Sequence, residues 1–166
     1  MEFKLRDWEI SDLESLVEHA DNYNIAKWLT NGFPHPYTTN DGKVFIESVL
    51  KDKTSKVFAI EVDGKAVGSI GVYFQSDIHE RSAELGYWLA EKYWKNGIIS
   101  RAIREVVNHV FANFNIMRIY ARPFHTNKPS QQVLEKAGFE FEARLKKALY
   151  KNGEYLDELI YAKLKD

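Results

Sequence analysis

The chain has 166 residues, the length of one domain, and 45% of them are hydrophobic, which is enough for a sizeable core. The net charge of −1 excludes the basic surface of a typical nucleic-acid-binding protein, and the lack of cysteine excludes disulfides, thiolate metal sites and a cysteine nucleophile. The sequence contains no membrane-spanning run and no apolar signal core at its start. We therefore expect one cytoplasmic domain, residues 1–166, that contacts neither nucleic acid nor membrane.

The first third of the chain is predicted to be mainly helical. Phe3 and Leu5 alternate with charged residues, which is typical of a short strand. Two prolines exclude a helix from residues 32–37, an aromatic loop. Apolar spacing and a threonine cap predict three helical segments: residues 13–20, a short turn at 25–29, and a helix after Thr38 or Thr39 that carries apolar residues through Leu50.

The rest of the chain alternates strands with two helices. Asp63-Gly64 and Asn152-Gly153 are typical of hairpin turns. An apolar stripe predicts a helix from Ile98, and a second helix begins at 127–130 and ends near Gly138. The predicted strands cover residues 57–62, 66–74, 81–90, 117–122, 139–145 and 155–164. The order β-α-α-β-β-β-α-β-α-β-β predicts an α/β (α+β) protein: a mixed sheet with helices on its faces and a parallel or splayed strand pair in the middle.

The passage from the strand at 83–90 into the helix at Ile98 is the most informative part of the sequence. A short polar turn with one glycine, Gly97, separates the two elements. Such a turn directs several free N–H groups at one point, where the helix dipole favours negative charge. This pattern predicts a phosphate site. A plain tight turn that caps a core helix remains the alternative, because one glycine is a weak motif.

The element order and several short segments resemble the GNAT superfamily of N-acetyltransferases over nearly the whole chain. The resemblance is greatest to the branch that acetylates ribosomal-protein N-termini, which also holds polyamine and antibiotic acetyltransferases. The segments that carry it are Leu5-Arg6, residues 33–37, residues 127–139 and residues 152–157. It implies the GNAT fold, with a mostly antiparallel sheet and a splayed parallel pair, and direct acetyl transfer from acetyl-CoA to an amine without a covalent enzyme intermediate. No His, Asp or Glu cluster has metal-ligand spacing, so no metal is expected.

The resemblance also implies a set of cofactor-binding residues. The family's pyrophosphate pattern, Gln/Arg-x-x-Gly-x-Gly/Ala, aligns with Trp94, Gly97 and Ile99, so two of its positions differ here. The strand end before the loop is expected to pair through its main chain with the pantetheine arm. The implied cofactor-binding residues are Trp88, Leu89, Ala90, Lys95, Asn96, Gly97, Ile98, Ile99, Ser100, Asn127 and Ser130.

Two residues are expected to take part in the chemistry. Glu84 is the candidate general base, since its apolar neighbours favour a raised pKa. Strand alternation places Glu84 and Trp88 on one face and Tyr87 on the other, and the pattern leaves open which face lines the cleft. Ser130 is the candidate general acid toward the thiolate; the alternative is that Asn127 caps the helix and Ser130 lies in its first turn.

An acceptor wall is expected from Phe33, His35, Tyr37 and Asp157, with the alternative that Asp157 is a solvated strand residue. The acceptor implied by the resemblance is an amine, foremost the α-amine of a protein or peptide N-terminus such as that of a ribosomal protein. A polyamine or aminoglycoside acetyltransferase and a non-catalytic acyl-CoA-binding protein are the alternatives. The oligomeric state stays open, with a homodimer among the possibilities.

Overall fold

A computed structural model describes all 166 residues of the chain. The predicted order of elements is confirmed, and the short helical turn between the first two longer helices is present. The strands are β1 (Lys4–Asp7), β2 (Ser55–Val62), β3 (Lys65–Phe74), β4 (Ser82–Leu89), β5 (Arg118–Ala121), β6 (Glu140–Lys151) and β7 (Glu154–Leu164). The helices are α1 (Leu13–Ala20), α2 (Tyr23–Ala26), α3 (Thr39–Lys51), α4 (Ile98–Asn113) and α5 (Lys128–Lys136), with short 3-10 helices η1 (Ile10–Asp12), η2 (Asp77–His79) and η3 (Glu91–Tyr93).

All seven strands belong to one sheet, in the order β1-β2-β3-β4-β5-β7-β6. Every neighbouring pair is antiparallel except β4 and β5, which are parallel. This parallel pair is registered only from Ser82 with Arg118 to Glu84 with Tyr120, although β4 continues to Leu89. The two strands therefore separate beyond Glu84, as expected for a splayed pair.

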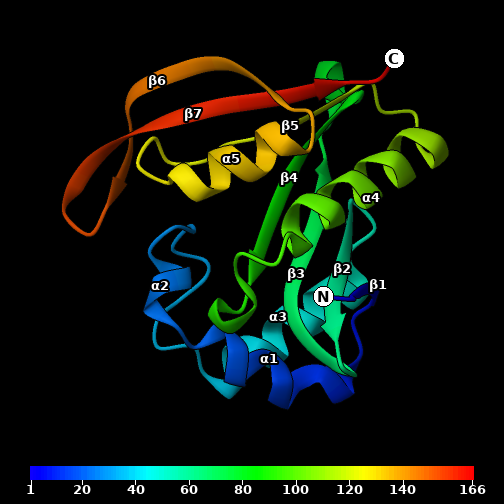
Figure 1. Cartoon of the computed structure of the whole chain (residues 1–166), viewed down its shortest axis with the longest axis vertical. Coiled ribbons are helices and arrows are strands. Elements are labelled where there is room, and N and C mark those ends of the chain that lie inside the picture. Colours follow the sequence, from blue (N-terminus) through cyan, green and yellow to red (C-terminus); the bar gives the residue numbers. More distant parts are fainter.

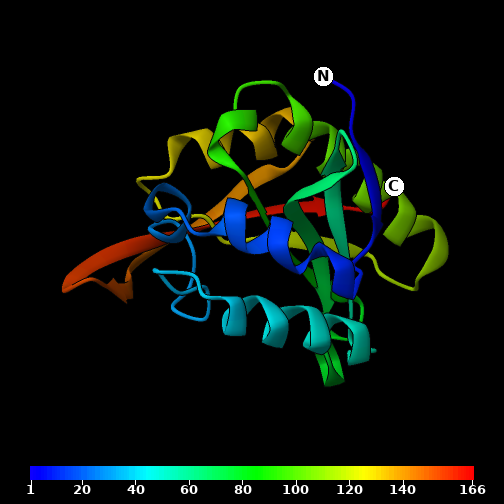
Figure 2. The same cartoon turned by 90° about the horizontal axis from the view of Figure 1, so that it is seen from below.

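The helices cover both faces of the sheet (Figure 2). On one face α4 and α5 complete the larger core, to which Ile103 and Leu134 contribute fully buried side chains. On the other face α1 and α3 cover a smaller core around Trp8, Leu16 and Ile46. The apolar stripe of α4 explains its place, since Ile98, Ala102, Val106 and Val110 recur at helical spacing and are all buried.

Two elements differ in extent from the prediction. Helix α2 begins at Tyr23 rather than at residue 25, because the Asn22 side chain accepts the N–H of Asn24 at 2.8 Å and caps the helix earlier. Strand β6 runs to Lys151 rather than ending near residue 145, with an irregular pairing to β7 between Leu145 and Leu149. The β6–β7 hairpin consequently projects beyond the rest of the sheet, and its tip lies beside α2 (Figure 1).

Both predicted hairpin turns are confirmed by backbone geometry. Asp63 and Gly64 have φ values of 49° and 78°, and Asn152 and Gly153 have 52° and 80°. Two successive positive φ values are the signature of the type I′ turn, which matches the twist of a hairpin. No helix of the chain combines the length and apolarity that crossing a membrane requires.

Candidate active site

A cleft of about 590 Å³ opens where β4 and β5 separate. Its walls come from β4, the loop before α4, the first turn of α4, one side of α5, the segment after β5, and α2 with the loop that follows it. Predicted residues that line it are Glu84, Trp88, Leu89, Lys95, Gly97, Ile98, Ile99, Ser100, Asn127 and Ser130. The sequence-based site is therefore largely assembled in one place, with exceptions described below.

Beyond Glu84, the main chain of β4 has groups on the cleft side that pair with no neighbouring strand. Ala90 donates its N–H to Val67 on β3 at 2.8 Å. Because hydrogen-bonded pairs alternate along an antiparallel ladder, Trp88 is paired with β3 as well, whereas Tyr87 and Leu89 direct their main-chain groups away from it. Both lie beyond the last residue of β4 that pairs with β5. The prediction for Ala90 is corrected, since its N–H is already used and it does not line the cleft.

The loop before α4 presents a row of unused donors. The N–H groups of the six residues from Lys95 to Ser100 donate to no acceptor within the chain. Lys95 and Gly97 both have left-handed backbone conformations, with φ of 64° and 69°, which turns successive N–H groups toward one side. Together with the dipole of the 16-residue helix α4, this arrangement suits a polyanion.

Side chains of the same loop satisfy its carbonyl groups. The Trp94 indole donates to the Leu89 carbonyl at 2.7 Å, and the Asn96 amide donates to the Tyr93 carbonyl at 3.1 Å. Asn96 thus supports the loop rather than lining the cleft with its side chain. Ile99 packs against the larger core, although it also contributes to the cleft surface. These hydrogen bonds stabilise the conformation of the loop.

A half-buried pair of hydroxyl groups, those of Tyr87 and Ser130, lines the same cleft. The Tyr87 phenol and the Ser130 hydroxyl are 2.7 Å apart. Burial raises the pKa of Tyr87, which outweighs the lowering by Ser130, so the phenol stays protonated near neutral pH. Asn127 caps α5 by accepting the Ser130 N–H at 3.3 Å. Asn127 therefore caps the helix, as the alternative interpretation predicted. It also lines the cleft, so a contact with the cofactor stays a prediction.

Glu84 lines the cleft, half-buried, on the face of β4 that also carries Trp88. Burial is the largest effect on its carboxyl group and raises the pKa; Arg122 opposes this effect and Glu158 adds to it. Glu84 and Tyr87 leave β4 on opposite faces, because side chains alternate along a strand. The carboxylate and the hydroxyl pair thus flank the strand from its two sides.

Arg122 and Glu158 form an ion pair beside Glu84. The guanidinium contacts the Glu158 carboxylate through Nε at 2.7 Å and Nη2 at 2.5 Å. The Glu158 side chain is only 6% exposed, whereas Arg122 is 43% exposed and lines the cleft. Arg122 is hydrogen-bonded to Glu158 and acts on Glu84 only through its charge, so Glu84 is the carboxylate without an ion-pair partner at this end of the cleft.

Comparison with known proteins bears on this geometry. Residues 2–140 match the family model described as the acetyltransferase (GNAT) domain. The chain belongs to the GNAT family. It is an N-acetyltransferase with acetyl-CoA as its acetyl donor, which confirms the resemblance drawn from the sequence.

Relatives of this GNAT chain have different acceptors in their names. Ribosomal-protein-serine acetyltransferase of Escherichia coli strain K12 is 31% identical over 112 residues, 68% of this chain and 62% of that protein. Spermidine N(1)-acetyltransferase of the same organism is 24% identical over 158 residues, 92% of this chain and 80% of that protein. The structure of the microcin C7 self immunity acetyltransferase MccE with acetyl-CoA and AMP, 24% identical, covers 99% of this chain and 93% of its own with a TM-score of 0.89, which supports the fold.

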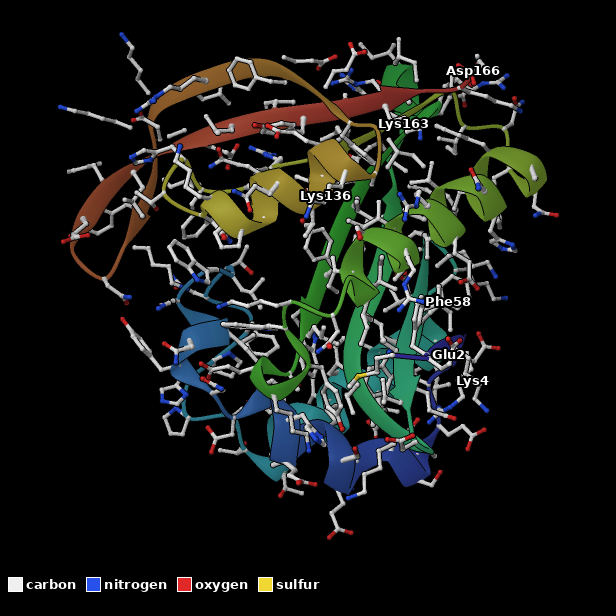
Figure 3. The ribbon with its side chains drawn as sticks, viewed as in Figure 1. Glu2, Lys4, Phe58, Lys136, Lys163 and Asp166 are labelled. Atoms are coloured by element: carbon white, nitrogen blue, oxygen red, sulfur yellow. The ribbon has the colours of Figure 1, made fainter.

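The residues present suit the donor of a GNAT enzyme. Six free N–H groups at the start of α4 match a pyrophosphate, and the unpaired main chain of Tyr87 matches an extended amide chain. Lys95 and Lys136 add positive charge on this side of the cleft. Lys136 lies at the end of α5 beside α4 (Figure 3), where its carbonyl accepts Arg104 at 3.2 Å. No group of three His, Cys, Asp or Glu side chains is arranged to hold a metal ion.

The predicted acceptor wall needs correction, because none of its four residues lines the cleft. Tyr37 is buried in the smaller core. The Phe33 ring packs against the same core and meets the Trp88 ring edge-on, with centroids 5.6 Å apart. The His35 ring is 3.5 Å from Asp21 on the α2 side. The Asp157 carboxylate accepts the Lys147 N–H and the Arg144 guanidinium at 2.8 and 2.6 Å, contacts that lower its pKa.

Other residues, which sequence reasoning missed, form the wall of this GNAT cleft beside α2 and after β5. They are Ile25, Trp28, Leu29 and Thr30 around the end of α2, and Arg122, Pro123 and Phe124 after β5. The Trp28 and Phe124 rings meet edge-on with centroids 6.2 Å apart. One local pattern in the sequence bears on this wall. Side chains alternate along β7, which puts Glu158, the partner of Arg122, on the face opposite Asp157.

Proposed function

We propose that this GNAT enzyme acetylates the α-amine of a protein or peptide N-terminus, such as that of a ribosomal protein. The observation that carries the proposal is the charge of the cleft. Glu84 is the only acidic residue that lines it, while Lys95, Arg122 and Lys136 are basic. One carboxylate suits a substrate with one ammonium group, whereas a polyamine needs several acidic partners.

Glu84 is proposed to accept the proton of the substrate ammonium, directly or through a water molecule. The free amine then bonds to the acetyl carbon, and the bond from that carbon to sulfur breaks. Burial supports this role, because a raised pKa brings a carboxylate closer to the pH at which an amine is deprotonated. Arg122 opposes the effect of burial on the pKa of Glu84 and so limits the rise.

Ser130 is proposed to donate a proton or a hydrogen bond to the departing sulfur. Tyr87, protonated and 2.7 Å away, is placed to donate to Ser130 in turn. The free N–H groups on β4 are proposed to stabilise the charge that develops on the acetyl oxygen, as main-chain donors do in an oxyanion hole. The cofactor-binding roles of residues 95–100 follow from their unused donors.

A small amine is the second candidate acceptor, since one relative is a spermidine acetyltransferase. Thiol release from acetyl-CoA distinguishes the candidates when peptides with free N-termini, the same peptides with blocked N-termini, spermidine and an aminoglycoside are compared. We expect the free peptides to exceed spermidine in kcat/KM by about tenfold or more, the worth of one matched charge contact. Preference for spermidine would overturn the acceptor proposal. CoA binding without acetylation of any amine would instead favour a non-catalytic acyl-CoA-binding protein.

A further inference from the structure

We propose that Lys151 is a positioning residue that fixes the acceptor wall of the cleft by tying the β6–β7 hairpin to the end of α2. The inference rests on the proposed function in one respect, since it assigns the α2 wall to the acceptor. It concerns a side chain that does not line the cleft.

The contact joins parts of the chain that are remote in sequence. The Lys151 ammonium donates to the Ala26 carbonyl at 2.9 Å and to the Leu29 carbonyl, across 125 and 122 residues. Lys151 is the last residue of β6, directly before the hairpin turn. The hairpin tip lies beside α2 in both views (Figures 1 and 2), so the projecting hairpin is anchored at its far end.

The acceptor carbonyls belong to a segment with little support of its own. Helix α2 has four residues, too few to satisfy its final carbonyl groups internally. Within the segment, the Ala26 carbonyl receives only the Leu29 N–H, at 3.1 Å. A cation at the end of a helix both donates to these carbonyls and complements their partial negative charge.

The charge of Lys151 has no other use in the structure. No carboxylate lies within ion-pair distance of its ammonium, although nine ion pairs occur elsewhere in the chain. The side chain is partly buried, and this burial lowers its pKa. A charged donor shared between two carbonyls makes stronger hydrogen bonds than a neutral one.

The tethered segment carries half of the acceptor wall. The residues of this segment that line the cleft adjoin or include those whose carbonyls Lys151 contacts: Ile25, Trp28, Leu29 and Thr30. The other end of α2 is held by the Glu91 carboxylate, which accepts the Asn22 amide at 2.7 Å and the Asn24 amide at 3.2 Å. The wall is therefore fixed at one end to η3, next to the cofactor loop, and at the other end to the hairpin.

The test compares Lys151→Met, which keeps the length and removes the charge, with Lys151→Arg and with the control Lys146→Met, an exposed lysine of the same strand without side-chain contacts. We expect Lys151→Met to raise KM for the peptide acceptor about tenfold, the worth of one charged hydrogen bond, with KM for acetyl-CoA unchanged. Lys151→Arg should restore most of the loss, and Lys146→Met should leave both constants unchanged. An unchanged acceptor KM in Lys151→Met, or an equal rise in both KM values, would overturn the inference.

A second measurement does not depend on activity. Amide hydrogen exchange of residues 26–31 should become faster in Lys151→Met and remain unchanged in Lys146→Met, because loss of the tether opens this segment locally. Unchanged exchange in Lys151→Met would contradict the tether itself. If the wild-type protein binds CoA but acetylates no amine, the proposed function fails, and the exchange result still decides whether Lys151 holds the wall.

Discussion

The proposed cofactor side of the cleft offers unused main-chain N–H groups from one stretch, residues 95–100, whereas the proposed acceptor side offers side chains from several distant stretches. On the cofactor side, six N–H groups remain free although the family's pyrophosphate pattern is kept only at Gly97. On the acceptor side, the charge depends on the side chains of Glu84, Arg122 and Glu158. A site made of main-chain donors tolerates changes of side chain, while a site made of side chains does not. Variants of the two sides should therefore differ in both size and kind of effect.

The largest effect is expected from Glu84→Gln. Loss of the general base should lower kcat/KM for the acceptor by about 10²–10⁴-fold while acetyl-CoA still binds. Because Glu84 acts when ionised and its pKa is raised, wild-type activity should fall as the pH drops through that raised pKa, and this acidic limb should vanish in the variant. Steady-state rates between pH 5 and 9 check this, with the exposed Glu105→Gln on α4 as control. If the fall in activity at acidic pH persists in Glu84→Gln, another residue is the general base.

A smaller effect, confined to the donor, is expected from Gly97→Ala. The left-handed conformation at Gly97 costs an alanine about 1–2 kcal/mol, so KM for acetyl-CoA should rise about tenfold while KM for the acceptor stays constant. The matched control is Gly64→Ala in the β2–β3 turn. Its φ is 78°, and a Cβ meets no atom within 4 Å at either glycine. We expect both variants to lose similar stability and only Gly97→Ala to lose affinity for acetyl-CoA. An equal loss of affinity in Gly64→Ala would attribute the effect to general strain rather than to the N–H groups of residues 95–100.

The smallest effect is expected where the two sides meet, in Ser130→Ala and Tyr87→Phe. Each removes one member of the hydroxyl pair and should lower kcat about fivefold, in line with the net worth of one hydrogen bond. CoA affinity, measured by calorimetry, should change less than kcat. Equal losses in affinity and kcat would make the pair a binding feature and leave the departing sulfur without a donor.

The cofactor side could be predicted from the sequence because its determinants are local. The strand at 83–90, Gly97 and the stripe that starts at Ile98 together specify a strand, a turn and a helix, and the free donors follow from that arrangement. The sequence could not show which residues of β4 hydrogen-bond to β3 and which direct their main-chain groups at the cleft. Trp88 and Ala90 pair with β3, whereas the main-chain groups of Tyr87 and the N–H of Leu89 remain free, a distinction set by the register of a neighbouring strand.

The acceptor side could not be predicted because its contacts are remote in the chain. Arg122 contacts Glu158 across 36 residues, and Lys151 contacts Ala26 across 125 residues. Asp157 and Glu158 illustrate the difficulty. They are adjacent on β7 and point to opposite faces, so that one contacts Arg144 on the hairpin and the other contacts Arg122 at the cleft. Charge in the sequence alone does not distinguish them.

Amide NMR of the full-length protein during titration with CoA tests the central claim most directly, since that claim places the donor on main-chain N–H groups. We expect the largest shifts at residues 95–100 and at Tyr87, with small shifts at Trp88 and Ala90, whose N–H groups are directed at β3. Subsequent addition of an acceptor peptide should shift Trp28 and Leu29 instead. Unmoved signals at residues 95–100 in the presence of bound CoA would contradict the account.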